Sequence, residues 1–105
     1  MKDYDVVKLY AKTERYRAAV SSALTFLEDH PRSKYEEEVA FILVKNSYLL
    51  SKNSVESKKV ERIEETKERY LKFVAQFPES EYRKTLADYN DLMEKELEEL
   101  KLTGK

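Results

Sequence analysis

The sequence contains no cysteine, one glycine and two prolines among its 105 residues. Without cysteine the chain can form no disulfide framework and no thiolate metal site, and it has no thiol nucleophile. The single glycine, Gly104, cannot build a phosphate-binding loop. So little glycine and proline, together with 39% charged residues, disfavours a sandwich, a barrel or a disordered chain and is typical of a helical protein.

Long apolar runs and an excess of charge of one sign are also missing. The longest unbroken apolar run has six residues, Val39 to Val44, whereas a membrane-spanning helix needs about 20. The formal net charge is −1, and the 20 basic and 21 acidic residues are interleaved. No positive field is available to attract DNA, RNA or an anionic membrane. We therefore expect no nucleic-acid partner and no insertion of this segment into a bilayer.

One short phrase occurs twice in the chain. The segment FLEDHPRSKY at residues 26–35 returns 47 positions later as FVAQFPESEY at residues 73–82. Four residues keep their places: Phe26, Pro31, Ser33 and Tyr35 match Phe73, Pro78, Ser80 and Tyr82. Each copy predicts the end of one helix, a proline corner and the start of the next helix. Repeats of this kind build surfaces for protein partners and rarely build catalytic sites.

Apolar residues spaced three and four apart predict five helices. We expect the first over about residues 2–12, the third over 34–51, the fourth ending near 76 and the fifth over 81–100. Helix caps are predicted at Thr13, at Ser54 or Ser57, and at Ser33, where Glu36 would complete a capping box. The third helix is apolar on nearly all sides and is expected at the centre, while the last has one apolar face, as a capping helix does.

The segment at residues 16–31 resembles the second helix of a tetratricopeptide repeat. Tyr16, Ala19, Ala23, Phe26 and Pro31 stand at the spacing of that motif, and Ile63, Thr66, Tyr70, Phe73 and Pro78 take the same places in the second copy. The resemblance implies an all-α fold of five antiparallel helices in a right-handed helical-repeat stack. We expect one domain over residues 1–105, with two repeats of period 47 and a C-terminal capping helix.

A phenylalanine-containing helix end followed by Pro-x-Ser-x-Tyr resembles the outer-membrane assembly lipoproteins of the BamD/YfiO type. Residues 47–82 are similar to the versions of that family with a long fourth helix. The family implies a lipoprotein on the periplasmic face of the outer membrane, acting as a scaffold that contacts the periplasmic domains of the BamA-type barrel subunit. The lipidated cysteine and the first repeats would then lie upstream. The alternative is a general adaptor that binds a linear peptide in its concave groove.

No set of residues in the sequence predicts catalysis or a cofactor. His30 is the only histidine, its neighbours Glu28 and Asp29 do not share its helix face, and Phe77 takes its place in the second copy. We therefore expect His30 to pack. The acidic runs at residues 36–38 and 94–99 cannot converge on one ion, because consecutive helical residues point about 100° apart. A solvated surface, with no metal and no enzyme activity, is the expectation.

Two groups of residues are candidates for contacting a partner. The first is the loop and helix start at Asn53, Ser54, Lys58 and Arg62, where the guanidinium could pair with a carboxylate or carbonyl of a docking domain. Helix capping and surface charge are the plainer explanation of the same residues. The second group is Tyr4 and Tyr48, which fit the apolar stripes least well among eight tyrosines and could belong to an interface.

Overall fold

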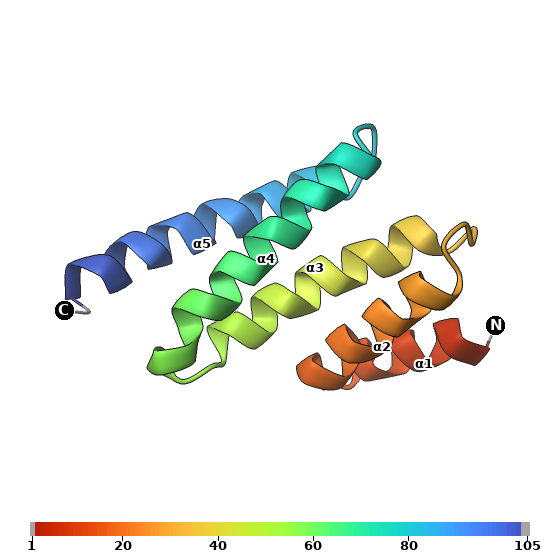
Figure 1. Ribbon diagram of the computed structural model, residues 1–105, viewed down its shortest axis with the longest axis horizontal. Helices are drawn as coiled ribbons and strands as arrows, with labels where there is room; N and C mark the ends of the chain where they lie inside the picture. Colours follow the sequence, from red (N-terminus) through yellow and green to blue (C-terminus); the bar gives the residue numbers. More distant parts are fainter. Residues whose placement is uncertain (1, 104–105) are drawn as a thin grey trace.

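The computed structural model describes residues 2–103, which form five α-helices and no strand. Consecutive helices run in opposite directions and pack side by side (Figure 1). The helices are α1 (Lys2–Lys12), α2 (Tyr16–Asp29), α3 (Glu36–Lys52), α4 (Glu56–Gln76) and α5 (Arg83–Thr103). The prediction of an all-α helical-repeat stack is confirmed, and the helix bounds differ from the expected ones by a few residues at most.

Helix α3 is the centre of the stack, as its sequence predicted. It packs against all four other helices, and it runs between α2 and α4 (Figure 1). Nine of its 17 residues are buried: Val39, Ala40, Ile42, Leu43, Val44, Asn46, Ser47, Tyr48 and Ser51. A helix with neighbours on several sides cannot keep a polar face, which explains why its apolar residues follow no single stripe.

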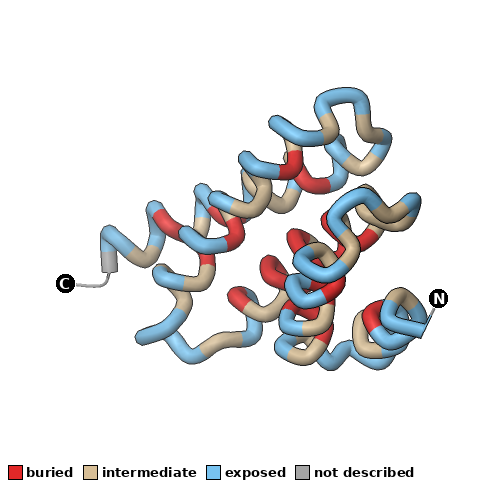
Figure 2. The backbone as a smooth tube through the Cα atoms, turned by 45° about the vertical axis from the view of Figure 1, so that its right-hand side comes forward, coloured by how far each residue is buried: buried red, intermediate tan, exposed pale blue. Residues whose placement is uncertain are grey.

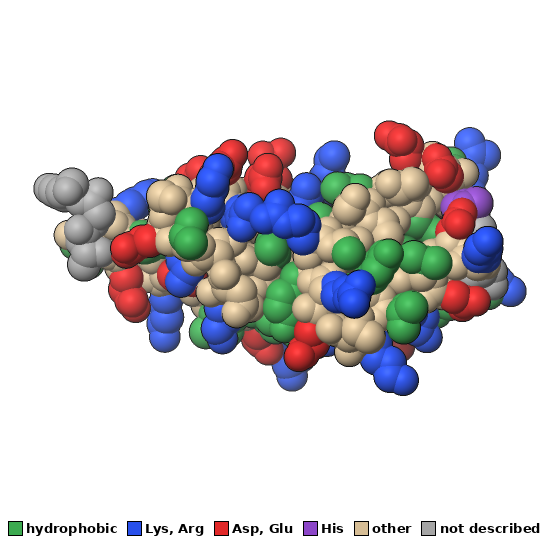
Figure 3. Space-filling model, turned by 90° about the horizontal axis from the view of Figure 1, so that it is seen from below, with side chains coloured by type: hydrophobic (Ala, Val, Ile, Leu, Met, Phe, Trp, Pro, Cys, Tyr) green, Lys and Arg blue, Asp and Glu red, His purple; other side chains and the backbone are tan. Residues whose placement is uncertain are grey.

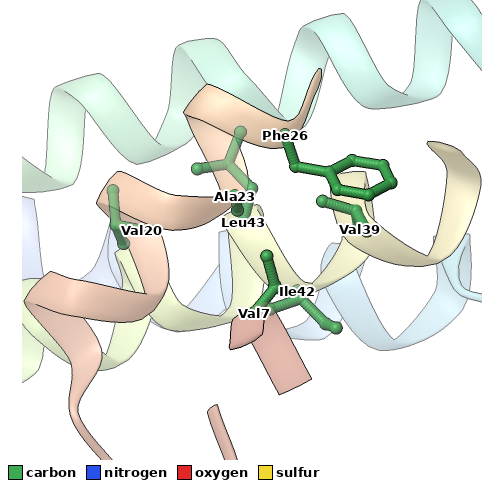
Figure 4. Close-up of a cluster of buried hydrophobic side chains, with 7 residues drawn as sticks. All are labelled: Val7, Val20, Ala23, Phe26, Val39, Ile42 and Leu43. Carbon is green, nitrogen blue, oxygen red and sulfur yellow. The ribbon is translucent and has the colours of Figure 1, made fainter. Parts of the chain in front are cut away.

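Three clusters of buried apolar side chains hold the helices together. The first joins α1, α2 and α3 through Val7, Val20, Ala23, Phe26, Val39, Ile42 and Leu43 (Figure 4). The second joins α3, α4 and α5 through Ala40, Val44, Phe73 and Leu86. The third joins the same three helices through Tyr48, Ile63, Met93 and Leu97. Buried residues therefore lie on the helix faces that point toward one another, while the outer faces are exposed (Figure 2).

The two proline corners have the same backbone geometry. At the first corner the His30 N–H donates to the Phe26 carbonyl at 2.8 Å, and at the second the Phe77 N–H donates to the Phe73 carbonyl at 2.8 Å. The backbone angles of His30 (φ −131°, ψ 62°) and Phe77 (φ −126°, ψ 65°) also agree. The sequence echo thus corresponds to one local structure that is built twice.

The corner serines act differently from the predicted helix caps. The Ser33 hydroxyl accepts a hydrogen bond from the Tyr35 N–H at 3.1 Å, and the second corner repeats this with Ser80 and Tyr82 at 3.1 Å. The capping box is a wrong prediction, because Ser33 bonds two residues ahead and forms a turn before α3 begins. The Glu36 carboxylate is engaged elsewhere and accepts from Gln76 Nε2 at 2.8 Å.

Each corner also leads into a tyrosine that stacks on an aromatic ring. Tyr35 stacks on Tyr4 of α1 with ring centroids 3.9 Å apart, and Tyr82 stacks on Phe41 of α3 at 4.2 Å. Phe41 follows Tyr35 by six residues, and the residue six places after Tyr82 is the exposed Asp88. Asp88 of α5 therefore takes the place that Phe41 holds in α3, so α5 lacks a ring at this position.

The turn between α1 and α2 corrects another predicted cap. Thr13 lies at the end of α1, where its hydroxyl donates to the Leu9 carbonyl at 2.9 Å, and Arg15 stands at the start of α2 without a side-chain cap. Glu14 adopts a left-handed conformation with φ 59°. Its N–H and that of Arg15 turn back to the carbonyls of Ala11 (3.2 Å) and Tyr10 (2.9 Å). This is a Schellman motif, which satisfies the free carbonyls of α1.

Candidate partner-binding surface

The predicted loop residues Asn53 and Ser54 close the end of α3. Asn53 donates from Nδ2 to the Leu49 carbonyl at 2.8 Å, and the Ser54 hydroxyl donates to the Leu50 carbonyl at 2.6 Å. The predicted N-cap of α4 at Ser54 or Ser57 is therefore wrong, since Val55 holds that place and α4 has no side-chain cap. The last carbonyls of α3 needed donors, and these two side chains supply them.

Ser54 and Arg62 are brought together by the turn into α4. The Arg62 Nη1 donates to the Ser54 hydroxyl at 2.6 Å, which ties the first turns of α4 to the end of α3. Arg62 is half-buried, whereas Asn53 and Lys58 are exposed. Lys58 and Arg62 both line a hollow that opens between α2 and α4. The four predicted residues thus lie in one region, with two of them facing this hollow.

The hollow, which we call the α2–α4 groove, runs between α2 and α4. Helices α2 and α4 both pack on α3 but not on each other, so α3 forms the floor between them. The larger part has a volume of about 930 Å³, and an adjoining part toward the start of α4 has about 390 Å³. Apolar side chains lie in the hollow between the two ends of the molecule, with Lys and Arg side chains beside them (Figure 3). Its lining includes Val20, Leu24, Leu27, Leu43, Val44 and Phe73.

A second arginine, Arg69, lines the groove and was not among the predicted residues. It lies seven residues after Arg62, on the same face of α4, and both parts of the groove include it. Its Nη1 donates to the Ser47 hydroxyl of α3 at 2.9 Å. Ser47 is 3% exposed and lies within the apolar helix α3. A polar residue inside an apolar helix is a sequence signal for a partner on another helix, but it does not identify that partner.

Tyr4 lies in a small polar network at the start of α1. Its hydroxyl donates to Glu38 Oε1 of α3 at 2.5 Å, and Lys8 lies 5.2 Å from the centre of its ring. The hydrogen bond to Glu38 raises the pKa of Tyr4 above its ordinary value, and desolvation adds to the shift. Stacking on Tyr35 and this hydrogen bond fix the ring, which remains partly exposed.

Tyr48 is part of the core, which corrects the expectation that it lies off the apolar stripes. It is 6% exposed and stacks on Tyr89 of α5 with ring centroids 4.6 Å apart. Burial is also the main reason why the pKa of Tyr89 is raised above its ordinary value. The misplacement has a physical cause, because α3 is buried on several sides and no single stripe describes it.

His30 packs at the first proline corner, as expected. Its ring lies 4.9 Å from that of Phe26, and its Nε2 lies 2.9 Å from Asp3 Oδ2 of α1. Asp3 is 27 residues away in the chain, so sequence neighbours could not reveal this partner. Within the part of the chain that the structure describes, no group of three or more His, Asp or Glu residues is placed to hold a metal ion.

Comparison with known families adds to this geometry. The family model described as YfiO, outer membrane lipoprotein, matches residues 2–101. The chain belongs to the YfiO family. The match covers all five helices of this YfiO-family chain nearly to the end of α5, and the resemblance seen in its repeated corners is confirmed. No curated protein matches the chain. Among the described residues of this YfiO-family chain, no helix is both long and apolar enough to cross a membrane.

Proposed function

We propose that this chain is a non-catalytic scaffold for protein–protein contacts in the complex that assembles β-barrel proteins in the outer membrane. It would act on the periplasmic face, and its partner would be the periplasmic domains of the BamA-type barrel subunit. The observation that carries the proposal is membership of an outer membrane lipoprotein family over residues 2–101, on a stack of repeated helices. Such stacks present extended surfaces to protein partners.

The end of the stack formed by the α3–α4 turn supports a docking role. Asn53, Val55 and Lys58 are exposed there, and the Val55 side chain is 67% exposed. The hydrogen bonds of Asn53 and Ser54 to α3 hold the turn in one conformation, so binding would cost little loop ordering. An apolar residue with cationic neighbours on a fixed turn matches the composition of interfaces, which combine apolar anchors with a polar rim.

A binding measurement with charge-reversal variants tests this proposal. The wild-type chain, Lys58→Glu and Arg62→Glu would each be titrated against the purified periplasmic domains of the barrel subunit from the same organism. We expect the wild type to bind and each variant to bind about tenfold more weakly, because a reversed charge turns attraction into repulsion. Lys84→Glu, an exposed lysine at the start of α5, is the matched control and should bind like the wild type.

Circular dichroism would establish that each variant keeps its helices before binding is compared. Absence of binding by the folded wild-type chain would overturn the proposal for this segment. Equal affinity of the wild type and both α4 variants would place the contact away from the α3–α4 turn and would overturn that part of the proposal.

A further inference from the structure

The α2–α4 groove contains two arginines whose charges are not neutralised. Arg62 donates to the Ser54 hydroxyl of the α3–α4 turn and Arg69 to the Ser47 hydroxyl of α3, and within residues 2–103 no carboxylate oxygen lies within 4.0 Å of either guanidinium. Serine is a neutral acceptor, so these bonds orient the guanidinium groups without cancelling their charge. Each guanidinium has five N–H donors, which leaves several for another acceptor.

The position of the two arginines differs from that of the other charged residues around the groove. Arg62 and Arg69 are half-buried, whereas the four carboxylates of the lining are exposed at the rim: Glu28, Glu61, Glu65 and Glu68. Water screens the exposed carboxylates strongly, but partly buried charges keep more of their field. The inside of the groove is therefore cationic although its rim is mixed.

The walls and floor between the arginines and the far end of α2 are apolar. Leu24 is 42% exposed and borders both parts of the groove, and Leu27, Leu43 and Phe73 continue the apolar surface. Arg62 and Arg69 are two helical turns apart on α4, which corresponds to about 10.5 Å along the axis. A helix that lies along α4 and carries two carboxylates seven residues apart presents them at the same separation.

We propose that the α2–α4 groove binds an amphipathic helical segment of a partner protein, with two carboxylates seven residues apart that pair with Arg62 and Arg69. Its apolar side chains would lie on Leu24, Leu27 and Phe73. This is the helix-in-groove mode of peptide recognition, with bidentate arginine–carboxylate pairs setting the register. The inference deepens the proposed scaffold function, since it names the chemistry of a second contact on the same stack.

The probe is a synthetic amphipathic helical peptide with a fluorescent label, carrying glutamates at positions i and i+7 of its polar edge. Two control peptides have the same length: one has glutamine at both positions, and the other has its glutamates at i and i+5, which point to different faces. Binding to the 105-residue chain would be followed by fluorescence anisotropy. We expect the matched peptide to bind at least tenfold more tightly than either control, because hydrogen bonds to charged groups depend on geometry.

Variants of the chain locate the site. Arg62→Gln and Arg69→Gln keep a hydrogen-bond donor for the serines but remove the charge, and each should weaken binding of the matched peptide about tenfold. Leu24→Asp should abolish binding of the matched peptide, because a carboxylate on the apolar wall repels the carboxylates of the peptide. Arg32→Gln, an exposed arginine at the first proline corner, is the matched control and should bind the peptide like the wild type.

Equal binding of the matched peptide and its glutamine version would overturn the proposal, and so would unchanged binding by both arginine variants in a folded chain. The test needs no barrel subunit, so its result is separate from that of the scaffold proposal. Peptide binding without capture of the barrel subunit's domains would reject the scaffold partner alone. Capture of the barrel subunit's domains without binding of the peptide would reject the groove proposal alone.

Discussion

Replacing Phe26 or Phe73 by alanine tests whether the two proline corners are equivalent in energy as well as in geometry. The two rings are 1% and 2% exposed, and each packs against the ring at its corner, 4.9 Å from His30 and 5.2 Å from Phe77. Truncating a buried phenylalanine costs about 3–5 kcal/mol of folding free energy, and loss of the ring pair is contained in that range. We expect each variant to lose about 3–5 kcal/mol, with a difference of less than about 1 kcal/mol between them.

Urea unfolding followed by far-ultraviolet circular dichroism measures both losses. The midpoint should fall while the slope of the transition stays constant, which shows that stability and not the unfolded state has changed. Leu71→Ala is the control, because that side chain is 61% exposed and its truncation should change the free energy of unfolding by less than about 0.5 kcal/mol. A loss below about 1.5 kcal/mol at either corner, or a difference above about 2 kcal/mol, would refute the equivalence.

Two further predictions concern pH and one backbone position. Burial raises the pKa of Tyr82 and Tyr89 above the ordinary value of 10.0. The folded state therefore holds the hydroxyl protons of these two tyrosines more tightly than the unfolded state does. Their contribution to the free energy of unfolding is complete below about pH 10 and is lost at higher pH. Urea titrations at rising alkaline pH should show a falling free energy of unfolding, with a shallower fall in Tyr89→Phe; an equal slope in that variant would contradict the assignment. Glu14→Gly should raise the free energy of unfolding by about 0.5–1 kcal/mol, since glycine adopts the left-handed conformation without the Cβ clash, and a loss of stability would contradict this.

The helices and the central place of α3 follow from the sequence because they depend on the spacing of apolar residues. A stripe of three- and four-residue steps specifies which face is buried, and six consecutive apolar residues at 39–44 require neighbours on several sides. The repeated corner is equally local, since Pro31 and Pro78 each stand two places before a serine that closes a turn. Local signals of this kind survive in the structure.

The predictions failed where a polar side chain could hydrogen-bond to more than one nearby group or to a residue on another helix. Thr13, Ser33 and Ser54 are good cap residues by type, yet each bonds a nearby group outside the expected cap. The pairs of Arg69 with Ser47 and of His30 with Asp3 span 22 and 27 residues, and helix packing alone brings them together. No periodicity along the chain encodes such contacts, so the groove and its second arginine emerged only from the structure.

The unequal length of the two repeats explains where the candidate surface lies. Tyr4 and Phe41 play the same role under their corner tyrosines but are 37 positions apart, ten fewer than the period of the corners themselves. Ten extra residues must therefore lie between Phe41 and the second corner, three at the end of α3 and seven at the start of α4. Because Tyr16 of α2 corresponds to Ile63 of α4, the first seven residues of α4, Glu56 to Arg62, have no counterpart in α2. Lys58 and Arg62 belong to this added segment, whereas Phe73 and the corner are shared; at the offset of 47 residues Arg62 falls on Arg15, which directly precedes α2. The added residues thus lengthen α4 by about two turns and α3 by about one, while the corner geometry stays the same. Repeat proteins bind partners through extended surfaces of this kind.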